Sequence, residues 1–201
     1  MLQSTDLLEL TTMPLWSDIS LGLYKEFSQK YLIPSIFRYH LENGKILDVH
    51  FADWSIYHIL GMQHIDGKIS KTDFFNEIDN GLDFNHFMND KRLKKRFNDF
   101  KHRIRMFACM YQIMKNEKLF YVQKHQLDNS AVVADYIKYA LIDQKGANVG
   151  IRLLDGKYMA YTLLVDRSIN PTATIDPLVP VKIKKLEIIR NGVVVETIKH
   201  S

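Results

Sequence analysis

His58 is the side chain whose type and setting best suit acid–base chemistry in this sequence. It lies in Tyr57-His58-Ile59-Leu60-Gly61, within a short apolar stretch that is expected to form a helix. Histidine gains and loses a proton near neutral pH, so it is well suited to act as a general acid or base. A lone histidine on an apolar helix is also commonly a hydrogen-bonded core residue. The sequence alone leaves both roles open.

Two further sets of side chains have the chemistry to complete a site around His58. Five polar residues on expected strands matter if they converge with His58 on one concave surface: Tyr136, Lys138, Arg152, Tyr161 and Thr162. Cations crowd the long helix expected after residue 90: Lys91, Arg92, Lys94, Lys95, Arg96, Lys101, Arg103 and Arg105. A cationic helix face of this kind can follow a phosphate backbone, although it is equally an ordinary solvated face.

Several well-known catalytic motifs do not occur in the sequence. Gly-x-Gly-x-x-Gly, Gly-x-x-x-x-Gly-Lys-Ser/Thr and Gly-x-Ser-x-Gly are missing, so nucleotide-cofactor enzymes, P-loop ATPases and typical serine hydrolases are not expected. No His-Glu-x-x-His occurs, and no histidine and carboxylate stand at a convincing metal spacing. We therefore expect neither a metal nor a cofactor. Cys109, the single cysteine, lies in Phe-Ala-Cys-Met and is expected to be a small buried apolar residue, not a nucleophile.

Length and composition are those of an ordinary globular protein. The chain has 201 residues, of which 46% are hydrophobic and 25% charged, and a formal net charge of +4. This length suits one domain with an appendage or two very small domains. We expect residues 1–35 to form an N-terminal arm and helix and residues 36–201 a single α+β domain. No apolar run approaches the roughly 20 residues of a membrane helix, and the first residues do not resemble a signal peptide. We expect a cytoplasmic protein without a membrane partner.

The first half of the chain is expected to be mainly helical. Residues 1–16 are poorly patterned and predict a loose arm, after which Asp18 is a candidate cap for a helix to residue 30. Alternating apolar residues around Asn43-Gly44 predict a hairpin over residues 37–51. Short helices are expected at 54–64 and 70–80. A long helix begins at Asn89 or Asp90, with one apolar stripe: Leu93, Phe97, Phe100, Ile104, Phe107, Tyr111 and Met114.

The second half reads as strands. Residues 119–124 predict a short strand, and residues 131–142 favour a strand over a helix because of their alternation and β-branching. Asp155-Gly156 and Asn191-Gly192 predict two further hairpins, over 148–165 and 181–199. Helices first and an antiparallel meander second indicate an α+β fold.

Four short motifs, in their order along the chain, resemble the motifs of a known family. They are Ile46-Leu-Asp-Val-His-Phe51, Tyr57-His-Ile-Leu-Gly-Met62, Ala134-Asp-Tyr136 and Tyr158-Met-Ala-Tyr-Thr-Leu-Leu164. In this order, over residues 36–199, they resemble a phage-associated branch of the barnase–EndoU–colicin–RelE-like nuclease superfamily. Four positions depart from the family pattern by apolar exchanges: Ile59, Met62, Leu163 and Leu164.

The resemblance implies N-terminal helices packed on a four- to five-stranded antiparallel sheet (barnase/RelE-like) whose concave face holds RNA. It also implies a metal-independent endoribonuclease of the toxin or phage-defence type, with an antitoxin or inhibitor that is an acidic protein or an RNA. In this chemistry the ribose 2′-OH attacks phosphorus and leaves a 2′,3′-cyclic phosphate. The reaction needs a base, an acid and fixed cations or donors for the charge on phosphorus.

Several residues are candidates for these tasks. We assign His58, Lys138, Arg103 and Thr162 to catalysis: His58 as acid or base, Lys138 or Arg103 on the phosphate, and Thr162 as a hydrogen-bond donor to it. We assign RNA binding to Lys94, Lys101, Arg105, Arg152 and Tyr136, with Arg152 also a candidate for the phosphate. RelE-like members work without a clear histidine base, so a structural His58 stays open. The alternative function is a non-catalytic nucleic-acid-binding or phage accessory protein.

Overall fold

A computed structural model describes residues 1–123, 133–166 and 178–200 of the chain. Seven α-helices and three short helical turns precede most of the strands in the described part. The α-helices are α1 (Leu21–Phe27), α2 (Asp53–Leu60), α3 (Met62–Ile65), α4 (Phe74–Asp79), α5 (Phe84–Asn89), α6 (Lys94–Phe107) and α7 (Met110–Lys115). The turns are η1 (Asp6–Leu8), η2 (Trp16–Asp18) and η3 (Ser28–Leu32), and η3 continues α1 as a π-helical turn. In the described part, no helix is long and apolar enough to cross a membrane.

All described strands belong to one mixed sheet, so the α+β class is confirmed. The strands are β1 (Ser35–Leu41), β2 (Ile46–His50), β3 (Leu119–Val122), β4 (Tyr136–Ile142), β5 (Lys145–Leu154), β6 (Lys157–Asp166), β7 (Leu178–Val181), β8 (Ile183–Arg190) and β9 (Val193–Lys199). Their order is β7-β3-β4-β5-β6-β2-β1-β8-β9, and only the β2–β6 pair is parallel. The expectation of four to five strands was therefore wrong, because the described residues alone form nine strands.

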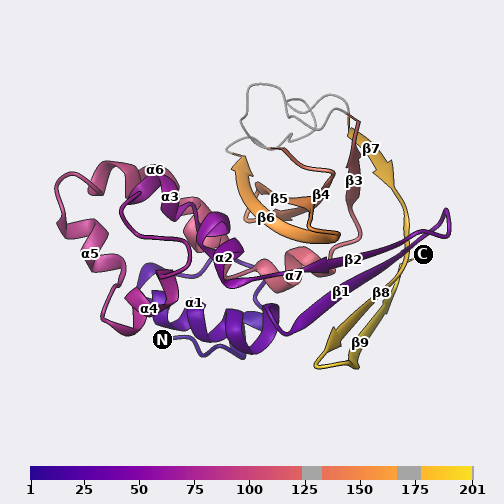
Figure 1. Cartoon of the computed structure of the whole chain (residues 1–201), viewed down its shortest axis with the longest axis horizontal. Coiled ribbons are helices and arrows are strands. Elements are labelled where there is room, and N and C mark those ends of the chain that lie inside the picture. Colours follow the sequence, from indigo (N-terminus) through magenta and orange to yellow (C-terminus); the bar gives the residue numbers. More distant parts are fainter. Residues whose placement is uncertain (124–132, 167–177, 201) are drawn as a thin grey trace.

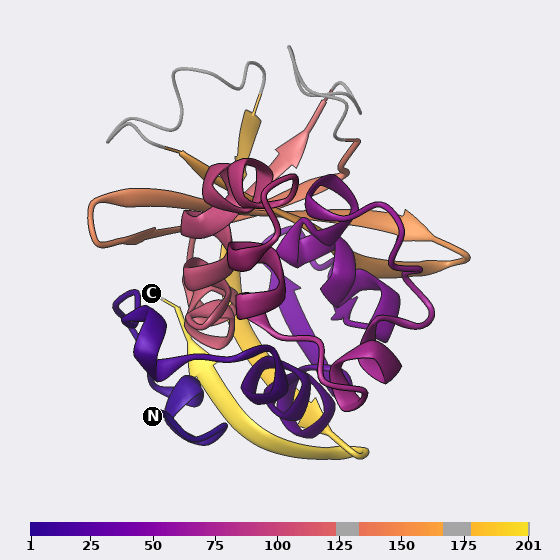
Figure 2. The same ribbon diagram turned by 90° about the vertical axis from the view of Figure 1, so that its left-hand side faces the viewer.

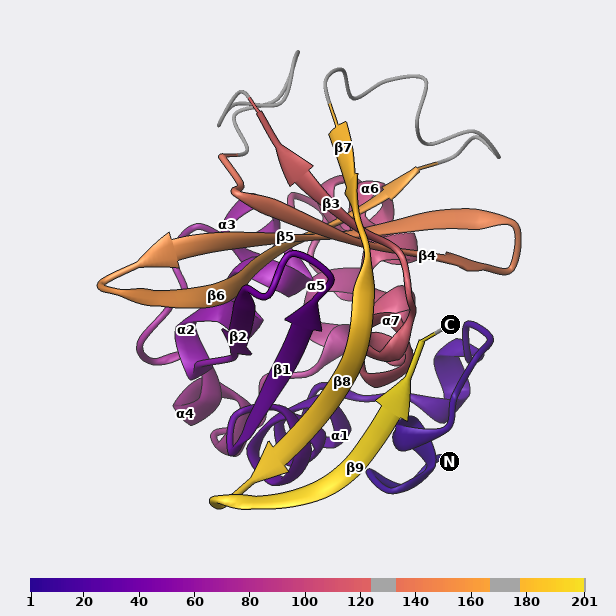
Figure 3. The same ribbon diagram turned by 90° about the vertical axis from the view of Figure 1, so that its right-hand side faces the viewer.

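The sheet curls back on itself (Figure 1). A single residue, Lys182, separates β7 from β8, yet β7 is the edge strand at one end of the order and β8 lies next to the other end. The continuous chain β7–Lys182–β8 therefore links the two ends of the sheet at one corner, where Glu42 donates its N–H to the Lys182 carbonyl at 3.0 Å. Figures 1 and 3 show β7 running directly into β8 along this curl.

Three hairpins expected from their turn residues are present. Asp155-Gly156 and Asn191-Gly192 have positive φ at both positions, 49° and 78° in the first and 51° and 80° in the second, which matches the right-handed twist of paired strands. The β1–β2 turn differs, because only Gly44 has a positive φ there. A fourth turn, at Asp143-Gln144, joins β4 to β5 without any glycine and was not expected from the sequence. The predicted strands at 119–124 and 131–142 include residues 124, 131 and 132, which lie outside the described part.

The helices gather on one side of the curled sheet, as Figures 2 and 3 show from opposite directions. Most of the apolar stripe expected on the long helix is buried, with Phe97 at 2% exposure and Ile104 and Phe107 at 0%, whereas Phe100 is only partly buried. The helix itself is not continuous: α6 ends at Phe107 and α7 begins at Met110. The helix expected at 54–64 is likewise divided at Gly61 into α2 and α3. The helix expected from Ser70 begins only at Phe74.

The N-terminal arm is packed, not loose. Leu7 is fully buried in the main hydrophobic core, and Leu2 donates its N–H to the Asp18 carbonyl at 3.1 Å. The first α-helix is capped by Ser20, whose Oγ accepts from the Leu23 N–H at 3.0 Å, and not by Asp18 as expected. The division of the chain at residue 35 stays a prediction.

Candidate active site

His58 lies on α2 with its imidazole half-buried against aromatic rings. The ring stacks on Tyr161 of β6, with centroids 5.2 Å apart and an interplanar angle of 24°. Trp54, one turn earlier on α2, meets both rings at 6.1 Å. The exposed Lys71 places its ammonium 5.9 Å from the centre of the Trp54 ring. Together with the imidazole, Trp54, Tyr161 and Lys71 form one cationic and aromatic surface, which we call the His58 surface.

A bulge in β6 brings this strand into the site. Gly150 of β5 pairs with Thr162 and Ile151 pairs with Ala160, so Tyr161 is an extra residue in β6. Consecutive side chains of a regular strand point to opposite faces, whereas a bulge redirects them. Here both Tyr161 and Thr162 contact the helices: Tyr161 stacks on His58 of α2, and Thr162 accepts from Arg103 of α6.

Arg103 holds α2 and β6 together from beneath the surface. Its side chain is 8% exposed, and its Nε donates to the Ile59 carbonyl at 2.6 Å. Its Nη2 donates to the His58 carbonyl and, at 3.1 Å, to the Thr162 Oγ1. The last carbonyls of a helix have no partner within the helix, so a buried guanidinium there satisfies them. Arg103 and Thr162 are therefore brought to His58, where the Arg103 guanidinium joins the end of α2 to β6.

Gly61 allows the close approach of α6 to the end of α2. It ends α2 with φ +80°, and a Cβ built on it would lie 2.5 Å from the Phe100 ring and 3.4 Å from the Arg103 Cζ. Phe100 in turn stacks on His64 of α3, with centroids 5.2 Å apart. A side chain at position 61 would push α6, and with it Arg103, away from the carbonyls of α2.

The environment of His58 favours the neutral imidazole. Burial lowers the pKa of His58 below its ordinary value of 6.5, and the cations Lys71 and Arg103 and the neighbouring His64 lower it further; the Gln63 side chain acts in the opposite direction. A neutral imidazole at neutral pH can accept a proton, which is what a general base must do.

Lys138 does not reach this site. It pairs with Val149, which pairs with Leu163, whereas Thr162 pairs with Gly150. Paired residues share a face of the sheet and neighbouring residues point to opposite faces, so Lys138 and Thr162 point to opposite faces. The Lys138 side chain is completely buried, donates to the Asn116 carbonyl and lies 4.7 Å from the centre of the Tyr39 ring. Burial lowers its pKa to about 7. The structure thus places Lys138 in the core.

The residues assigned to RNA binding are divided among several surfaces. Lys94 and Lys101 are exposed on α6, and Arg152 pairs with Met159 on β5, on the same face as Gly150 and Thr162. Arg105 donates to the carbonyls of Pro14 at 2.7 Å and Met13 at 3.3 Å, which ties it to the N-terminal arm. Tyr136 points to the Lys138 face and accepts from Lys45 at 2.8 Å.

Sequence reasoning missed part of the His58 surface. Trp54 lies four residues before His58, a spacing that places both on one helix face, so this signal was present. Lys71 had no such signal, because its position depends on how the turn before α4 packs against α2. In the three described ranges no group of three or more histidine, cysteine, aspartate or glutamate side chains is arranged to hold a metal ion.

A scan against family models matched residues 22–170 to the phage-Barnase-EndoU-ColicinE5/D-RelE like nuclease4 family. The chain belongs to this nuclease family. The match covers α2, α6 and the bulge of β6. All residues of the His58 surface therefore lie within the part of this nuclease that matches the family. The resemblance noted from the order of the motifs is thereby confirmed. Searches of curated proteins and of solved structures found no match to this nuclease.

Proposed function

We propose that this nuclease is an endoribonuclease that cleaves RNA by 2′-OH transesterification, with His58 as the general base. The half-exposed imidazole of His58, held neutral between aromatic rings and beside a cation, is the observation that carries the proposal. Its place within the segment matched to a nuclease family supports the assignment.

In the proposed reaction, phosphorus exchanges its bond to the 5′ oxygen for a bond to the 2′ oxygen. The 2′ oxygen forms a bond to phosphorus as His58 takes its proton, and the bond between phosphorus and the 5′ oxygen breaks. The leaving oxygen takes a proton, for which the Lys71 ammonium is the candidate donor; the same cation stabilises the charge that develops on phosphorus. The products are a 2′,3′-cyclic phosphate and a 5′-OH end. Trp54 and Tyr161 offer ring faces on which unpaired bases can stack.

The direct test is digestion of total RNA in excess EDTA by the wild-type protein and by His58→Ala and His58→Gln. We expect cleavage with cyclic-phosphate ends by the wild type and at least a hundredfold slower cleavage by both variants. His86→Ala, a change at an exposed histidine on α5, is the matched control and should cleave normally. Normal cleavage by folded His58→Gln, or cleavage that stops in EDTA, would contradict the proposed mechanism.

The pH dependence of cleavage gives an independent check on the base. Because the pKa of His58 is lowered, the cleavage rate should rise with pH to a plateau, with the midpoint of the rise below the ordinary histidine value of 6.5. Lys71→Gln removes a cation that lowers this pKa, so the acidic limb of the profile should move to higher pH, and the plateau rate should also fall. Single-turnover rates from pH 4.5 to 8.5 measure both effects. An unshifted acidic limb would show that a group other than His58 controls the rate.

We further propose a toxin or phage-defence role, supported by the phage-associated family to which the chain belongs. Expression of the wild type should then arrest growth of the host cell, and His58→Ala should not. A second candidate, nucleic-acid binding without cleavage, is favoured by the exposed lysines of α6, such as Lys94 and Lys101. Intact RNA with folded wild-type protein, together with salt-sensitive RNA binding, would favour this candidate.

A further inference from the structure

The imidazole of His58 needs a polar partner if it is to present a lone pair in a fixed direction. A neutral imidazole carries its proton on either nitrogen, and an acceptor beside one nitrogen keeps the proton there and leaves the lone pair on the other. Trp54, Tyr57 and Tyr161 surround the ring of His58 with aromatic contacts. Contacts between ring faces and edges do not select one of the two nitrogens.

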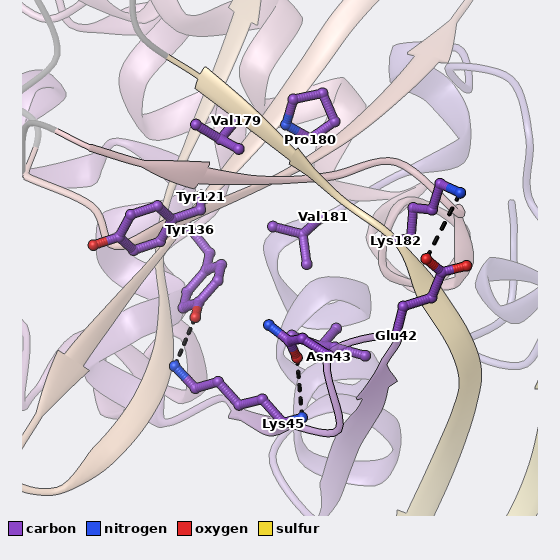
Figure 4. A pocket seen from close by; sticks show the side chains of 10 residues that line it. Glu42, Asn43, Lys45, Tyr121, Tyr136, Val179, Pro180, Val181 and Lys182 are labelled. Carbon is purple, nitrogen blue, oxygen red and sulfur yellow. Dashed lines mark hydrogen bonds and ion pairs between the residues drawn. The ribbon is translucent and has the colours of Figure 1, made fainter.

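Gln63 on α3 has a buried acceptor without a partner. Its side-chain Oε1 is shielded from solvent and has no hydrogen-bond partner among the described residues. Figure 4 shows the opposite situation at the corner of the sheet, where Lys45 donates to the Tyr136 hydroxyl at 2.8 Å and Lys182 pairs with Glu42 at 3.6 Å. A buried acceptor that stays unpaired costs free energy, so its presence calls for an explanation.

The turn at Gly61 fixes the position of Gln63 relative to His58. The Gly61 N–H donates to the His58 carbonyl at 3.0 Å, so the chain leaves α2 in a defined direction. Met62 and Ile65, at the two ends of the single-turn helix α3, are fully buried in the core. With both of its ends anchored in this way, α3 holds Gln63 in one place.

The amide of Gln63 acts on the imidazole through its oxygen. Gln63 raises the pKa of His58, whereas burial, Lys71, Arg103 and His64 all lower it. An amide oxygen accepts from the protonated ring and stabilises it, whereas the amide NH₂ group would oppose protonation. The oxygen is therefore the atom directed at the ring. Hydrogen bonds of catalytic groups are often long or poorly aligned without substrate and shorten in the complex, which accounts for the unpaired Oε1.

We propose that Gln63 is a positioning residue for His58: its Oε1 accepts the N–H of one imidazole nitrogen and leaves the lone pair of the other nitrogen for the ribose 2′ proton. The inference rests on the proposed role of His58 as the general base. The same oxygen stabilises the imidazolium that forms when His58 takes the proton.

The test that needs no cleavage is the ¹⁵N spectrum of the imidazole nitrogens in the full chain. The signals of His58 are identified by their loss in His58→Gln. At a pH above the titration of His58, the wild type should show one protonated and one unprotonated nitrogen. In Gln63→Leu both signals should move towards the average of two tautomers. Gln29→Leu, a change at an exposed glutamine of η3, is the matched control and should leave them unchanged.

Titration of the same signals measures the second effect of Gln63. The pKa of His58 should fall in Gln63→Leu, which loses the acceptor, and rise in Gln63→Glu, which places a carboxylate at the ring. Leucine fills a similar volume without a buried unpaired oxygen, so the melting temperature of Gln63→Leu should not fall. A lower pKa with unchanged thermal stability separates positioning from a structural role.

Single-turnover cleavage of RNA from pH 4.5 to 8.5 connects the arrangement to catalysis. Gln63→Leu should cleave about tenfold more slowly or less on the plateau, because its base is no longer held in one orientation. Gln63→Glu should recover most of this rate, with its acidic limb at higher pH. Unchanged nitrogen signals in Gln63→Leu would overturn the proposal, even if RNA is cleaved. Intact RNA with the wild type, together with changed nitrogen signals in Gln63→Leu, would contradict the proposed function but support the orientation of His58 by Gln63.

Discussion

Lys138 is a buried amine whose protonation opposes folding. Its pKa is lowered to about 7 by burial, whereas the same amine in the unfolded chain titrates near 10.5. Between these two values the unfolded chain binds the additional proton, so stability must rise with pH over this interval. One bound proton corresponds to a slope of at most about 1.4 kcal/mol per pH unit.

Replacing Lys138 by methionine should remove this dependence. Methionine fills a similar volume without a charge, so we expect Lys138→Met to raise the free energy of unfolding at pH 7 by about 1–3 kcal/mol, after the loss of the bond to the Asn116 carbonyl. Urea unfolding from pH 7 to 10 measures this, with the exposed Lys184→Met as the control. A variant that retains the wild-type slope would show that another group is responsible.

At the scale of elements, the junction of α2 and α3 determines where His58 stands. Gly61→Ala adds a Cβ that would lie 2.5 Å from the Phe100 ring, at a φ of +80° that only glycine adopts without cost. The backbone alone should cost about 1–3 kcal/mol, and the displacement of Phe100 more. Gly81→Ala provides the comparison, because its φ is +97° but nothing lies within 4 Å of the added Cβ. Thermal unfolding should show a larger loss for Gly61→Ala, together with slower RNA cleavage. Equal losses would show that the close approach of Phe100 to Gly61 does not add to the loss of stability.

The elements also show what local sequence patterns can and cannot predict. The apolar stripe from Leu93 to Met114 and the Asp155-Gly156 and Asn191-Gly192 turns were correctly predicted, because each depends on neighbours within a few residues. The interruption between Phe107 and Met110 was not, since the stripe continues across it. His58 could be selected by its chemistry, and Trp54 by its spacing. The burial of Arg103 could not be predicted, because its partners lie on α2 and β6.

At the scale of the whole molecule, cations of the same helix, α6, have different structural roles. Lys94 and Lys101 face solvent, whereas Arg105 is bonded to the carbonyls of Met13 and Pro14. If the exposed face of α6 contacts RNA phosphates, Lys94→Ala and Lys101→Ala should each reduce the slope of log binding constant against log salt by about 0.7. Arg105→Ala should leave the slope unchanged and lower the melting temperature. Binding of a single-stranded RNA to the His58→Ala protein at several salt concentrations measures this. Unchanged slopes in both lysine variants would place the RNA elsewhere.

The number of strands could likewise not be predicted from local sequence patterns. Each hairpin could be recognised, but nothing in Val181 to Arg190 shows that this segment passes from one end of the sheet to the other at Lys182. The parallel pairing of β2 with β6, through Val49 and Tyr158, joins segments more than a hundred residues apart. Such contacts are set by packing of the whole core.

The pairing of β1 with β8 also affects the order in which the chain can fold. Ser35 lies opposite Arg190, so β1 finds one of its two neighbours only after the long stretch of chain up to Arg190 has been synthesised. Contacts between distant segments are slow to form because a long loop must close first. On the ribosome, β1 and β2 must therefore wait with an open edge until the segment that forms β8 has emerged. The interval during which that edge is open to chaperones, or to pairing with a second nascent chain, is set by the speed of translation.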